Sequence, residues 1–344
     1  MLKATAGLRL LPGRQSQDIL DTVEAHLRKT EFFIPPRAVE IMDGSEEGVF
    51  AWITVNFLLG RLGKRDKLPT VGIMDLGGGS TQIVLEPSNP RSLASAPGSS
   101  VYSLKFGKFT YKLYQHSYLG FGLMEARKKI KSLALDDKDG RVRLFVIPTT
   151  AHLSIINQPP NPQPQPQKTT CLPNGFVEDF VIGDAKYRVH GKSHEEKEVA
   201  CLTEAEAILN KRAPCPHDTF CSFAGVFQPP AHHFPEEMYA FSYFYDRTET
   251  MPAPFPESLS VQAYKQEVSK LCNQEYDDPA LRGVFESNPH VCMDLCFIHQ
   301  LLSHGYGLTD STSLQLAKKI KGYETGWCMG AMMKVLDEHD RFCN

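Results

Sequence analysis

Short apolar runs rich in β-forming residues alternate along this chain with longer segments in which apolar residues recur every three or four positions. The short runs predict strands and the longer segments predict helices. Strands that alternate with helices indicate an α/β fold. We expect strands at residues 2–5, 38–42, 70–76, 81–86, 101–106, 109–115, 177–189 and 239–245. We expect helices from about residue 16 and at residues 46–62, 121–133, 203–211, 258–272, 292–303 and 326–337.

The first two of these helices are the most clearly defined. The first begins at Ser16, a suitable N-cap residue, and carries an apolar stripe at i, i+4 and i+8 formed by Ile19, Val23 and Leu27. The second, at residues 46–62, is mostly apolar and has two glutamates in its first turn. Between the predicted elements, a segment rich in Ser, Pro, Asn and Gly at 88–100 and a Pro/Gln-rich segment at 157–168 predict exposed loops.

The sequence DLGGGSTQI, at residues 75–83, joins two predicted strands. A plain hairpin needs one or two glycines, whereas this turn has three, followed by Ser-Thr. Glycines without side chains let an anion approach the backbone N–H groups, so we expect a phosphate-binding turn. Asp75 at the end of the buried strand is a candidate ligand for a divalent metal through water, and Gln82 is a candidate to orient a water. The alternative is a hairpin with a wide turn.

Two further stretches carry candidate catalytic groups. Glu47 lies in the first turn of an apolar helix, where most glutamates only stabilise the helix dipole. Gly48 follows it and lets a cleft approach the carboxylate, so Glu47 is a candidate general base for water. Thr5, between Ala4 and Ala6, places a small hydroxyl at a strand end, where it suits phosphate or attacking water; a helix-entry turn is the alternative.

Composition narrows the class of protein. The chain has 344 residues, which suits about two domains, with 42% hydrophobic and 22% charged residues, as in soluble globular proteins. A net charge of −3 gives no electrostatic reason to expect nucleic acid or an anionic membrane surface. No apolar run approaches the ~20 residues of a membrane span, and the N-terminal sequence has no signal-peptide pattern.

Nine cysteines lie between residues 171 and 343, without any CxxC pair. The spacings match no zinc pattern, so disulfides and an oxidising compartment are the better interpretation. The most local pairings are Cys171–Cys201, Cys215–Cys221, Cys272–Cys292 and Cys328–Cys343. These leave Cys296, although Cys292 lies one helical turn away and is an alternative free residue.

Three stretches resemble one family in order and spacing: ATAGLRLLP (4–12), EEGVFAWITVN (46–56) and DLGGGSTQI (75–83). They are similar to the second, third and fourth signature regions of the nucleoside diphosphatase/apyrase family. Likenesses continue through QHSYLGFGLMEAR (115–127), CLPNGF (171–176), CSFAGVFQP (221–229), YAFSYFYDR (239–247) and ETGWCMGA (324–331). The last two look most like the fungal-type Golgi guanosine diphosphatase branch.

This resemblance implies a two-lobed α/β fold of the actin/Hsp70/hexokinase type, also called ribonuclease-H-like, with the nucleotide between the lobes. Residues 1–43 with about 313–344 would form the first lobe, and about 44–312 the second lobe with disulfide-bearing insertions. The family hydrolyses terminal phosphoanhydrides with Ca²⁺, Mg²⁺ or Mn²⁺. The branch implies GDP and UDP as substrates in the Golgi lumen, in support of protein glycosylation.

The resemblance also implies roles for particular residues. Glu47 matches the base that activates water, Asp75 matches the residue that holds the hydrated metal, and Thr5 matches a polar group near the attacking water. Trp327 and, less closely, Tyr245 resemble aromatic residues that stack on the nucleotide base; buried core is the alternative for both. The second phosphate loop corresponds to Gly77, Gly78, Gly79, Ser80, Thr81 and Gln82.

One departure from the family pattern matters for function. The family's first signature region and its N-terminal anchor helix would precede ATAGLRLLP, whereas the sequence begins at Met1, immediately before that motif. We therefore expect a truncated first lobe, no targeting segment in the chain, poor solubility and little activity on GDP. The open interpretations are a luminal diphosphatase, a broader apyrase that accepts triphosphates, and an inactive chain that at most binds nucleotide.

Overall fold

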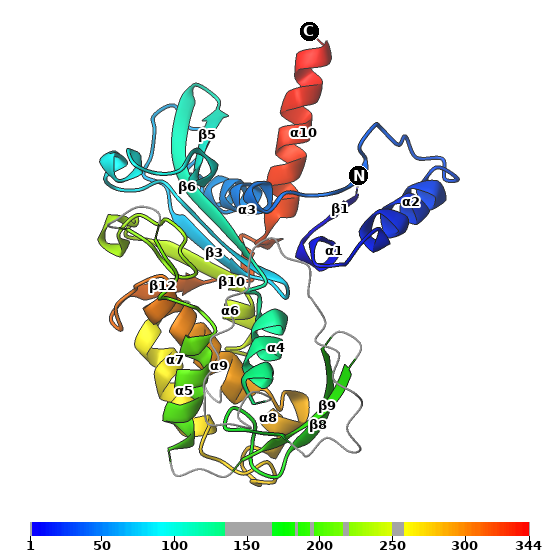
Figure 1. The fold of residues 1–344 in the computed structure, drawn as a ribbon. Coiled ribbons are helices and arrows are strands. Elements are labelled where there is room, and N and C mark those ends of the chain that lie inside the picture. Colours follow the sequence, from blue (N-terminus) through cyan, green and yellow to red (C-terminus); the bar gives the residue numbers. More distant parts are fainter. Residues whose placement is uncertain are drawn as a thin grey trace.

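A mixed sheet forms the centre of the molecule (Figure 1). The computed structural model describes residues 2–134, 167–182, 185–192, 196–215, 220–249 and 258–343. Within them the central sheet has seven strands in the order β11-β12-β10-β3-β4-β6-β5. Strand β10 runs parallel to β3 and β12, and the other pairs are antiparallel. The strands are β3 (Gly72–Leu76), β4 (Ser80–Leu85), β5 (Val101–Phe106), β6 (Phe109–Leu119), β10 (Met238–Ser242), β11 (Ser258–Ser260) and β12 (Ser313–Leu316).

Helices cover both faces of this sheet, and the strand period of two divides the core between them. Ile73 and Val84 pack on the face toward α3, whereas Met74 and Ile83 pack on the opposite face. The first face is covered by α3 (Gly44–Leu58), on which α10 (Trp327–Cys343) rests. The second is covered by α4 (Leu123–Leu133), α5 (Lys197–Ala207), α7 (Val261–Leu271) and α9 (Val291–Gln300) (Figure 1).

Helix α3 is buried because the sheet contacts one side of it and α10 the other. Asp43 caps its N-terminus by accepting a hydrogen bond from the Ser45 N–H at 2.8 Å, so the helix starts at Gly44, two residues before the predicted start. The predicted reason for Gly48 is wrong. A Cβ there would lie 2.8 Å from Cγ2 of Val84, so this glycine lets α3 approach β4 and does not open a cleft.

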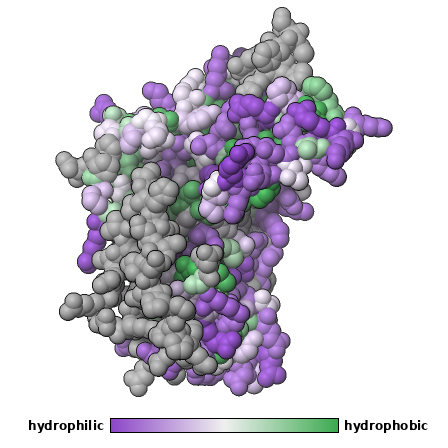
Figure 2. Space-filling view, turned by 45° about the vertical axis from the view of Figure 1, so that its right-hand side comes forward, coloured by the Kyte–Doolittle hydropathy of each residue, from purple (hydrophilic) through white to green (hydrophobic). Residues whose placement is uncertain are grey.

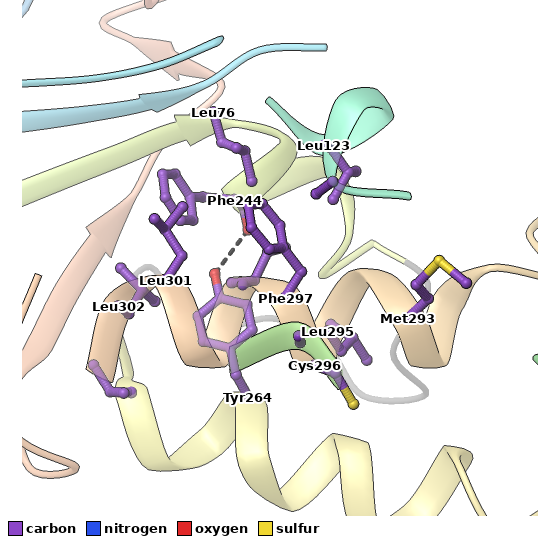
Figure 3. Packing of buried hydrophobic residues seen from close by; sticks show 14 of the residues in the cluster. Leu76, Leu123, Phe244, Tyr264, Met293, Leu295, Cys296, Phe297, Leu301 and Leu302 are labelled. Carbon is purple, nitrogen blue, oxygen red and sulfur yellow. Dashed lines mark hydrogen bonds between the residues drawn. The ribbon is translucent and has the colours of Figure 1, made fainter. Parts of the chain in front are cut away.

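The core on the second face is aromatic and aliphatic (Figure 3). The Tyr264 hydroxyl of α7 donates a hydrogen bond to the Phe244 carbonyl at 2.8 Å, and Phe297 and Leu301 surround this contact. Phe244 belongs to α6 (Tyr243–Asp246), which ends the run predicted as strand 239–245. The chain thus turns into a helix directly after Ser242.

The N-terminal segment lies to one side of the central sheet (Figure 1). Its strands β1 (Leu2–Ala4) and β2 (Val39–Ile41) pair in parallel, and α1 (Ala6–Arg9) and α2 (Gln15–Leu27) lie between them in sequence. The predicted cap of α2 is wrong, because the helix starts at Gln15 and Ser16 donates its hydroxyl to the Leu8 carbonyl. Of the predicted stripe, Val23 and Leu27 are partly buried, whereas Ile19 is 43% exposed and the neighbouring Leu20 is buried in its place.

Other boundaries differ from the sequence pattern. The run 177–189 is a hairpin of β8 (Val177–Ile182) and β9 (Ala185–Gly191), which pairs with β7 (Gln167–Thr169). Residues 157–166 of the predicted loop lie outside the described residues. Residues 88–100 contain η1 (Pro90–Leu93) and η2 (Gly98–Ser100). The remaining elements are η3 (Ala231–His233), α8 (Arg282–Ser287), the π-helical turn η4 (Leu301–Gly305), β13 (Lys319–Ile320) and β14 (Tyr323–Glu324).

The predicted boundary between the two lobes lies near residue 313, at the start of strand β12. Strand β12 pairs with β10, so residues 313–316 are part of the central sheet. The division into two lobes stays a prediction.

On the face seen in Figure 2 the residues drawn in colour are mostly hydrophilic. Phe32 and Phe33, in the connection between α2 and β2, are exposed.

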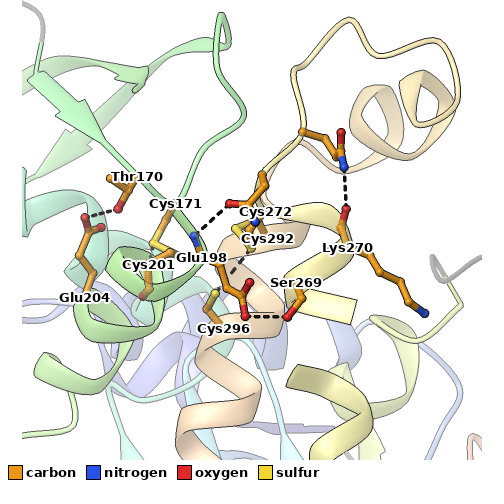
Figure 4. Close-up of a disulfide and its surroundings, with 12 residues drawn as sticks. Thr170, Cys171, Glu198, Cys201, Glu204, Ser269, Lys270, Cys272, Cys292 and Cys296 are labelled. Atoms are coloured by element: carbon orange, nitrogen blue, oxygen red, sulfur yellow. Dashed lines mark hydrogen bonds between the residues drawn. A yellow bond between two sulfur atoms is a disulfide. The ribbon is translucent and has the colours of Figure 1, made fainter. Parts of the chain in front are cut away.

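Three of the four predicted disulfides are confirmed: Cys215–Cys221, and Cys171–Cys201 and Cys272–Cys292, whose cysteines are labelled in Figure 4. Cys296 is free and buried, as expected for the residue left over. The fourth pairing is wrong: Cys328 is free and exposed. It lies in the same helix as Cys343, where fifteen residues of rise separate the Cα atoms by about 22 Å, beyond the ~7 Å limit of a bridge.

Candidate active site

Asp75 and Gln82 face each other across the β3–β4 hairpin, on the side toward α3. Asp75 is 7% exposed, and its Oδ1 is buried without a hydrogen-bond partner among the described residues. Burial raises the pKa of Asp75 to about 6, while a hydrogen bond with the Ser242 hydroxyl opposes the shift. An unsatisfied buried carboxylate oxygen of this kind is suited to a cation or a water.

Glu47 lies in the first turn of α3 and is 7% exposed. Burial raises its pKa to about 7; Arg9 acts to lower this pKa, and the charge of Asp75 raises it further. Glu46 points elsewhere and forms an ion pair with Lys334 at 2.9 Å, because neighbouring helical positions lie about 100° apart. Of the two adjacent acids, only Glu47 is therefore brought to Asp75.

Arg9 is a member of this group that the sequence interpretation missed. Its Nη2 donates a hydrogen bond to Oε2 of Glu47. A Cβ on Gly44 would lie 2.3 Å from Nη1 of Arg9, so the missing side chain leaves room for the guanidinium at the start of α3. The available signal was its position in ATAGLRLLP, four residues and about one helical turn after Thr5.

The glycine turn is anchored to the first turn of α4. The Gly77 carbonyl accepts a hydrogen bond from the Leu123 N–H at 2.9 Å, and the Gly78 carbonyl accepts one from Met124 at 3.0 Å. Because a peptide group holds its C=O and N–H on opposite sides, the N–H groups of Gly78 and Gly79 point away from α4. Neither has an acceptor within the part of the chain that the structure describes. Gly77 differs, since its N–H donates to the Ser80 carbonyl at 3.0 Å.

Close packing requires two of the glycines around this turn. A Cβ on Gly79 would lie 2.9 Å from Cβ of Ala6 in α1, and one on Gly122 would lie 2.4 Å from the Gly78 carbonyl carbon. The turn is therefore held between α1 and the start of α4. This packing fixes the direction of the two unused N–H groups in advance of any ligand.

The three polar residues after the glycines divide between the two faces of the sheet. The Gln82 side chain donates from Nε2 to the hydroxyls of Ser80 at 2.7 Å and Ser117 at 2.9 Å, which leaves its Oε1 as the group free for a water. Thr81 points to the opposite face, where its hydroxyl donates to the Asp75 carbonyl at 2.9 Å. Thr81 thus supports the end of β3, and its side chain is not brought to Glu47.

Among the described residues, Thr5, Trp327 and Tyr245 make no hydrogen bond to Glu47 or Asp75. Thr5 is half-buried at the start of α1, and its hydroxyl makes no capping hydrogen bond. Trp327 begins α10 and packs partly buried against the α3 core, whereas Tyr245 in α6 packs partly buried against the core on the other face. No ring contact joins these two aromatic residues in the described part of the chain.

The donor set around Asp75 fits a hard divalent cation. Hard cations take carboxylate oxygens and keep several waters, and Oδ1 of Asp75 is the unpartnered acceptor here. A second cluster, formed by Cys201, Cys292 and Cys296, has its sulfur atoms within 4.8 Å of one another. Two of those sulfurs are in disulfides, so this cluster is not a metal site in the oxidised protein.

Comparison with known families decides the class of protein. Residues 1–342 match the model of the GDA1/CD39 (nucleoside phosphatase) family. The chain belongs to this family. Family members are nucleotidases that generally depend on divalent cations, and the predicted family is confirmed.

Several GDA1/CD39 relatives are similar over nearly the whole chain. It is 38% identical to the guanosine-diphosphatase of Candida albicans, over 98% of this chain and 58% of the relative. It is 38% identical to the guanosine-diphosphatase of Saccharomyces cerevisiae, over 99% and 67%. It is 36% identical to the human nucleoside diphosphate phosphatase ENTPD5, over 98% and 69%. The chain thus spans between 58% and 69% of these relatives' lengths.

The predicted actin-like α/β fold of this GDA1/CD39 member is also confirmed. The nucleoside triphosphate hydrolase structure from Neospora caninum superimposes with a TM-score of 0.62 at 14% identity, covering 97% of this chain and 71% of that one. Among the described residues, no helix combines the length and apolar character needed to cross a bilayer.

Proposed function

We propose that this chain hydrolyses the terminal phosphoanhydride of a nucleoside diphosphate to a monophosphate and inorganic phosphate. The observation that carries this proposal is a pair of buried carboxylates beside the glycine turn. Glu47 has a pKa of about 7 and interacts with the charge of Asp75, and the turn has two unused N–H groups. The names of the fungal and human relatives, guanosine-diphosphatase and nucleoside diphosphate phosphatase, support the same substrate class.

The terminal phosphate binds to the glycine turn in this proposal. The N–H groups of Gly78 and Gly79 donate to phosphate oxygens, and the Ser80 hydroxyl adds a third polar contact. Phosphoryl transfer needs positioning and charge neutralisation more than a covalent nucleophile. Backbone donors fixed by α1 and α4 supply these without reorganisation during the reaction.

Water is the nucleophile, and Glu47 is the base. Ionised Glu47 accepts a proton from the water, whose oxygen attacks the terminal phosphorus. The bond between that phosphorus and the bridging oxygen breaks, and the electron pair leaves with the nucleoside monophosphate. The Gln82 carbonyl oxygen and the Thr5 hydroxyl orient the water. A base with a pKa near the working pH is effective in this role.

The divalent cation, Ca²⁺, Mg²⁺ or Mn²⁺, is assigned to Asp75 through water. When bound, such a cation neutralises charge on the phosphate oxygens. Its presence also favours ionised Asp75 and so removes the cost of burying that carboxylate uncompensated. The cation requirement in general follows the family, and the assignment to Asp75 rests on its unpartnered Oδ1.

We assign base stacking to Trp327 and Tyr245, each partly buried and so able to offer an exposed ring surface. GDP is the proposed preferred substrate, with UDP second, since two of the relatives are named guanosine-diphosphatases. The proposed location is the Golgi lumen, where removal of the diphosphate product supports glycosylation. Three disulfides support an oxidising compartment of this kind.

The decisive experiment is phosphate release by the purified chain with GDP, UDP, GTP or ATP, each with Ca²⁺, Mg²⁺ or Mn²⁺ and with chelator. We expect release from GDP and UDP that requires metal and is lost in Glu47→Gln. Comparable release from triphosphates would instead support a broader apyrase. Nucleotide binding without any release would refute catalysis.

A further inference from the structure

We propose that Asp294 is a positioning residue that holds two backbone segments next to the phosphate site, namely the first turn of α4 and the turn from β10 into α6. We call this arrangement the clamp. The inference rests on the proposed function for its catalytic consequence, but the clamp itself is a statement about structure. Asp294 lies in α9 and is fully buried. It does not contact the cluster of Glu47 and Asp75, so any effect on the reaction must pass through other residues.

Both oxygens of Asp294 bind Arg127 of α4. Nε of Arg127 donates to Oδ1 at 2.6 Å, and Nη2 donates to Oδ2 at 2.5 Å. Asn288 completes the arrangement: its Nδ2 donates to Oδ2 of Asp294 at 3.1 Å, and its Oδ1 accepts from Nη2 of Arg127 at 3.1 Å. A bidentate pair fixes direction as well as distance, so α4 is held in one orientation on α9.

The first route runs from Arg127 to the glycine turn. Nη1 of Arg127 lies 3.8 Å from Sδ of Met124, one turn earlier in α4. The Met124 side chain covers Gly78, whose ideal Cβ position lies 3.5 Å from Cγ of Met124. The same turn of α4 donates the N–H groups of Leu123 and Met124 to the carbonyls of Gly77 and Gly78. Fixing α4 therefore fixes the peptides whose opposite sides carry the unused donors.

The second route runs from Asp294 to the end of β10. Nε of Arg247 lies 3.3 Å from Oδ2 of Asp294, and its guanidinium lies over the Tyr243 ring at 4.9 Å. The Arg247 N–H closes α6 by donating to the Tyr243 carbonyl at 3.2 Å. Helix α6 begins after Ser242, a non-glycine residue held at φ 56° opposite Leu76.

One carboxylate thus joins the two segments that flank Asp75. A left-handed backbone at Ser242 costs free energy and persists only where surrounding contacts impose it. The clamp supplies such contacts, and it holds the turn that carries Tyr245. A buried ion pair that only stabilises the fold has no reason to join these two particular segments, since apolar residues of similar volume serve that purpose equally well.

The chain contains a matched control, a second carboxylate that anchors α4, in this case from β8. Glu178 forms an ion pair with Lys131 in the last turn of α4, at 3.1 Å, and contacts His290 at 2.9 Å. This pair also anchors α4, and both partners are largely buried. It lies about one turn farther from the glycine turn than Arg127 does. Loss of a carboxylate anchor can therefore be compared at the two positions.

The test compares Asp294→Asn with Glu178→Gln by amide hydrogen exchange of the full chain without nucleotide. We expect exchange of the Leu123, Met124 and Arg247 amides to become at least tenfold faster in Asp294→Asn and to change less than threefold in Glu178→Gln. Unchanged exchange in Asp294→Asn, or equal loosening in both variants, would overturn the clamp. If Asp294→Asn does not fold, the same exchange comparison is made with Arg127→Lys, because an ammonium cannot form the bidentate pair. The expected and the contradicting exchange rates are then the same as for Asp294→Asn.

Kinetics with GDP then test the catalytic consequence. We expect kcat to fall about 10- to 100-fold in Asp294→Asn, because displaced donors lose contact with charge that develops in the transition state. KM should rise less than kcat falls, and Glu178→Gln should stay within about threefold of the unmodified chain. If the unmodified chain releases no phosphate, the proposed function fails while the exchange experiment still decides on the clamp. Unchanged kcat with loosened amides would refute the positioning role.

Discussion

Asp75 in strand β3 and Asp294 in helix α9 are both buried aspartates, but their charges are compensated differently. Asp294 accepts hydrogen bonds on both oxygens and lies between two arginines. Asp75 keeps one unpartnered oxygen, and its pKa is raised to about 6 by burial. An uncompensated buried carboxylate costs stability, so we infer that Asp75 is retained for a ligand that completes it.

Glu178 and Glu47 repeat this contrast. Burial acts to raise the pKa of Glu178, but His290 and Lys131 together hold it below its usual value. Burial raises the pKa of Glu47 to about 7 although Arg9 is close. Carboxylates on the α4 and α9 side are therefore paired for structure. Between α3 and the β3–β4 hairpin, Glu47 keeps a raised pKa despite its ion pair with Arg9, and Asp75 keeps an unpartnered oxygen. These two carboxylates are therefore suited to exchange protons or bind a cation.

The largest effect is expected from Glu47→Gln. If this carboxylate is the only base for water, kcat on GDP should fall about 100-fold or more. Phosphate release under saturating GDP and metal measures it. Glu46→Gln is the control, because Glu46 pairs with Lys334 outside the cluster and should cost much less. Equal losses in the two variants would contradict the assignment of the base.

Asp75→Asn should stabilise the metal-free chain at pH 8, by an amount on the order of 3 kcal/mol. The folded pKa of about 6 lies above the ordinary value of 3.8, so stability falls as pH rises through this interval and the penalty is complete above it. The gain should therefore be small at pH 4. Denaturant unfolding at both pH values with chelator present measures it.

The same substitution at the paired aspartate should act in the opposite direction. Asp294→Asn should destabilise the chain at pH 8, since it leaves two buried guanidiniums without their carboxylate. Stabilisation by both substitutions, or by neither, would break the contrast between paired and unpaired carboxylates.

Arg9→Gln should move the pH–activity profile by on the order of one pH unit. Arg9 favours the ionised form of Glu47, so its removal raises the pKa of that base above about 7. The rising limb of kcat/KM against pH should shift upward accordingly. A downward shift would show that another group controls this limb.

The smallest effect is expected from Cys328→Ser. Cys328 is exposed and free, so the three disulfides and the unfolding midpoint should be unchanged within error. Peptide mapping without reductant should still give Cys171–Cys201, Cys215–Cys221 and Cys272–Cys292. A Cys328–Cys343 bridge that is mapped in the unmodified chain and absent from the variant would restore the pairing rejected above.

Local patterns predicted much of this molecule. The glycine hairpin, the helix that carries Glu47 and three disulfides depend on residues close in sequence or on short loops. The role of Asp294 could not be predicted, because its partner Arg127 lies 167 residues away and the contact depends on tertiary packing. Arg9 had its position in ATAGLRLLP as a signal, but its partner Glu47, 38 residues away, is set by tertiary packing. The pairing of Cys328 with Cys343 failed because one continuous helix carries both residues.

The contact between α3 and α10 has a consequence for synthesis of the chain on the ribosome. Gly330 approaches the Phe50 carbonyl too closely for any side chain, and its N–H donates to the Thr54 hydroxyl at 2.9 Å across 276 residues of sequence. At ~5–20 residues per second, α3 waits roughly 15 to 55 s before this partner emerges. During that time a nascent helix with apolar residues on every side lacks its outer cover. Chaperones that bind such helices are thus expected to act while the chain is still attached to the ribosome.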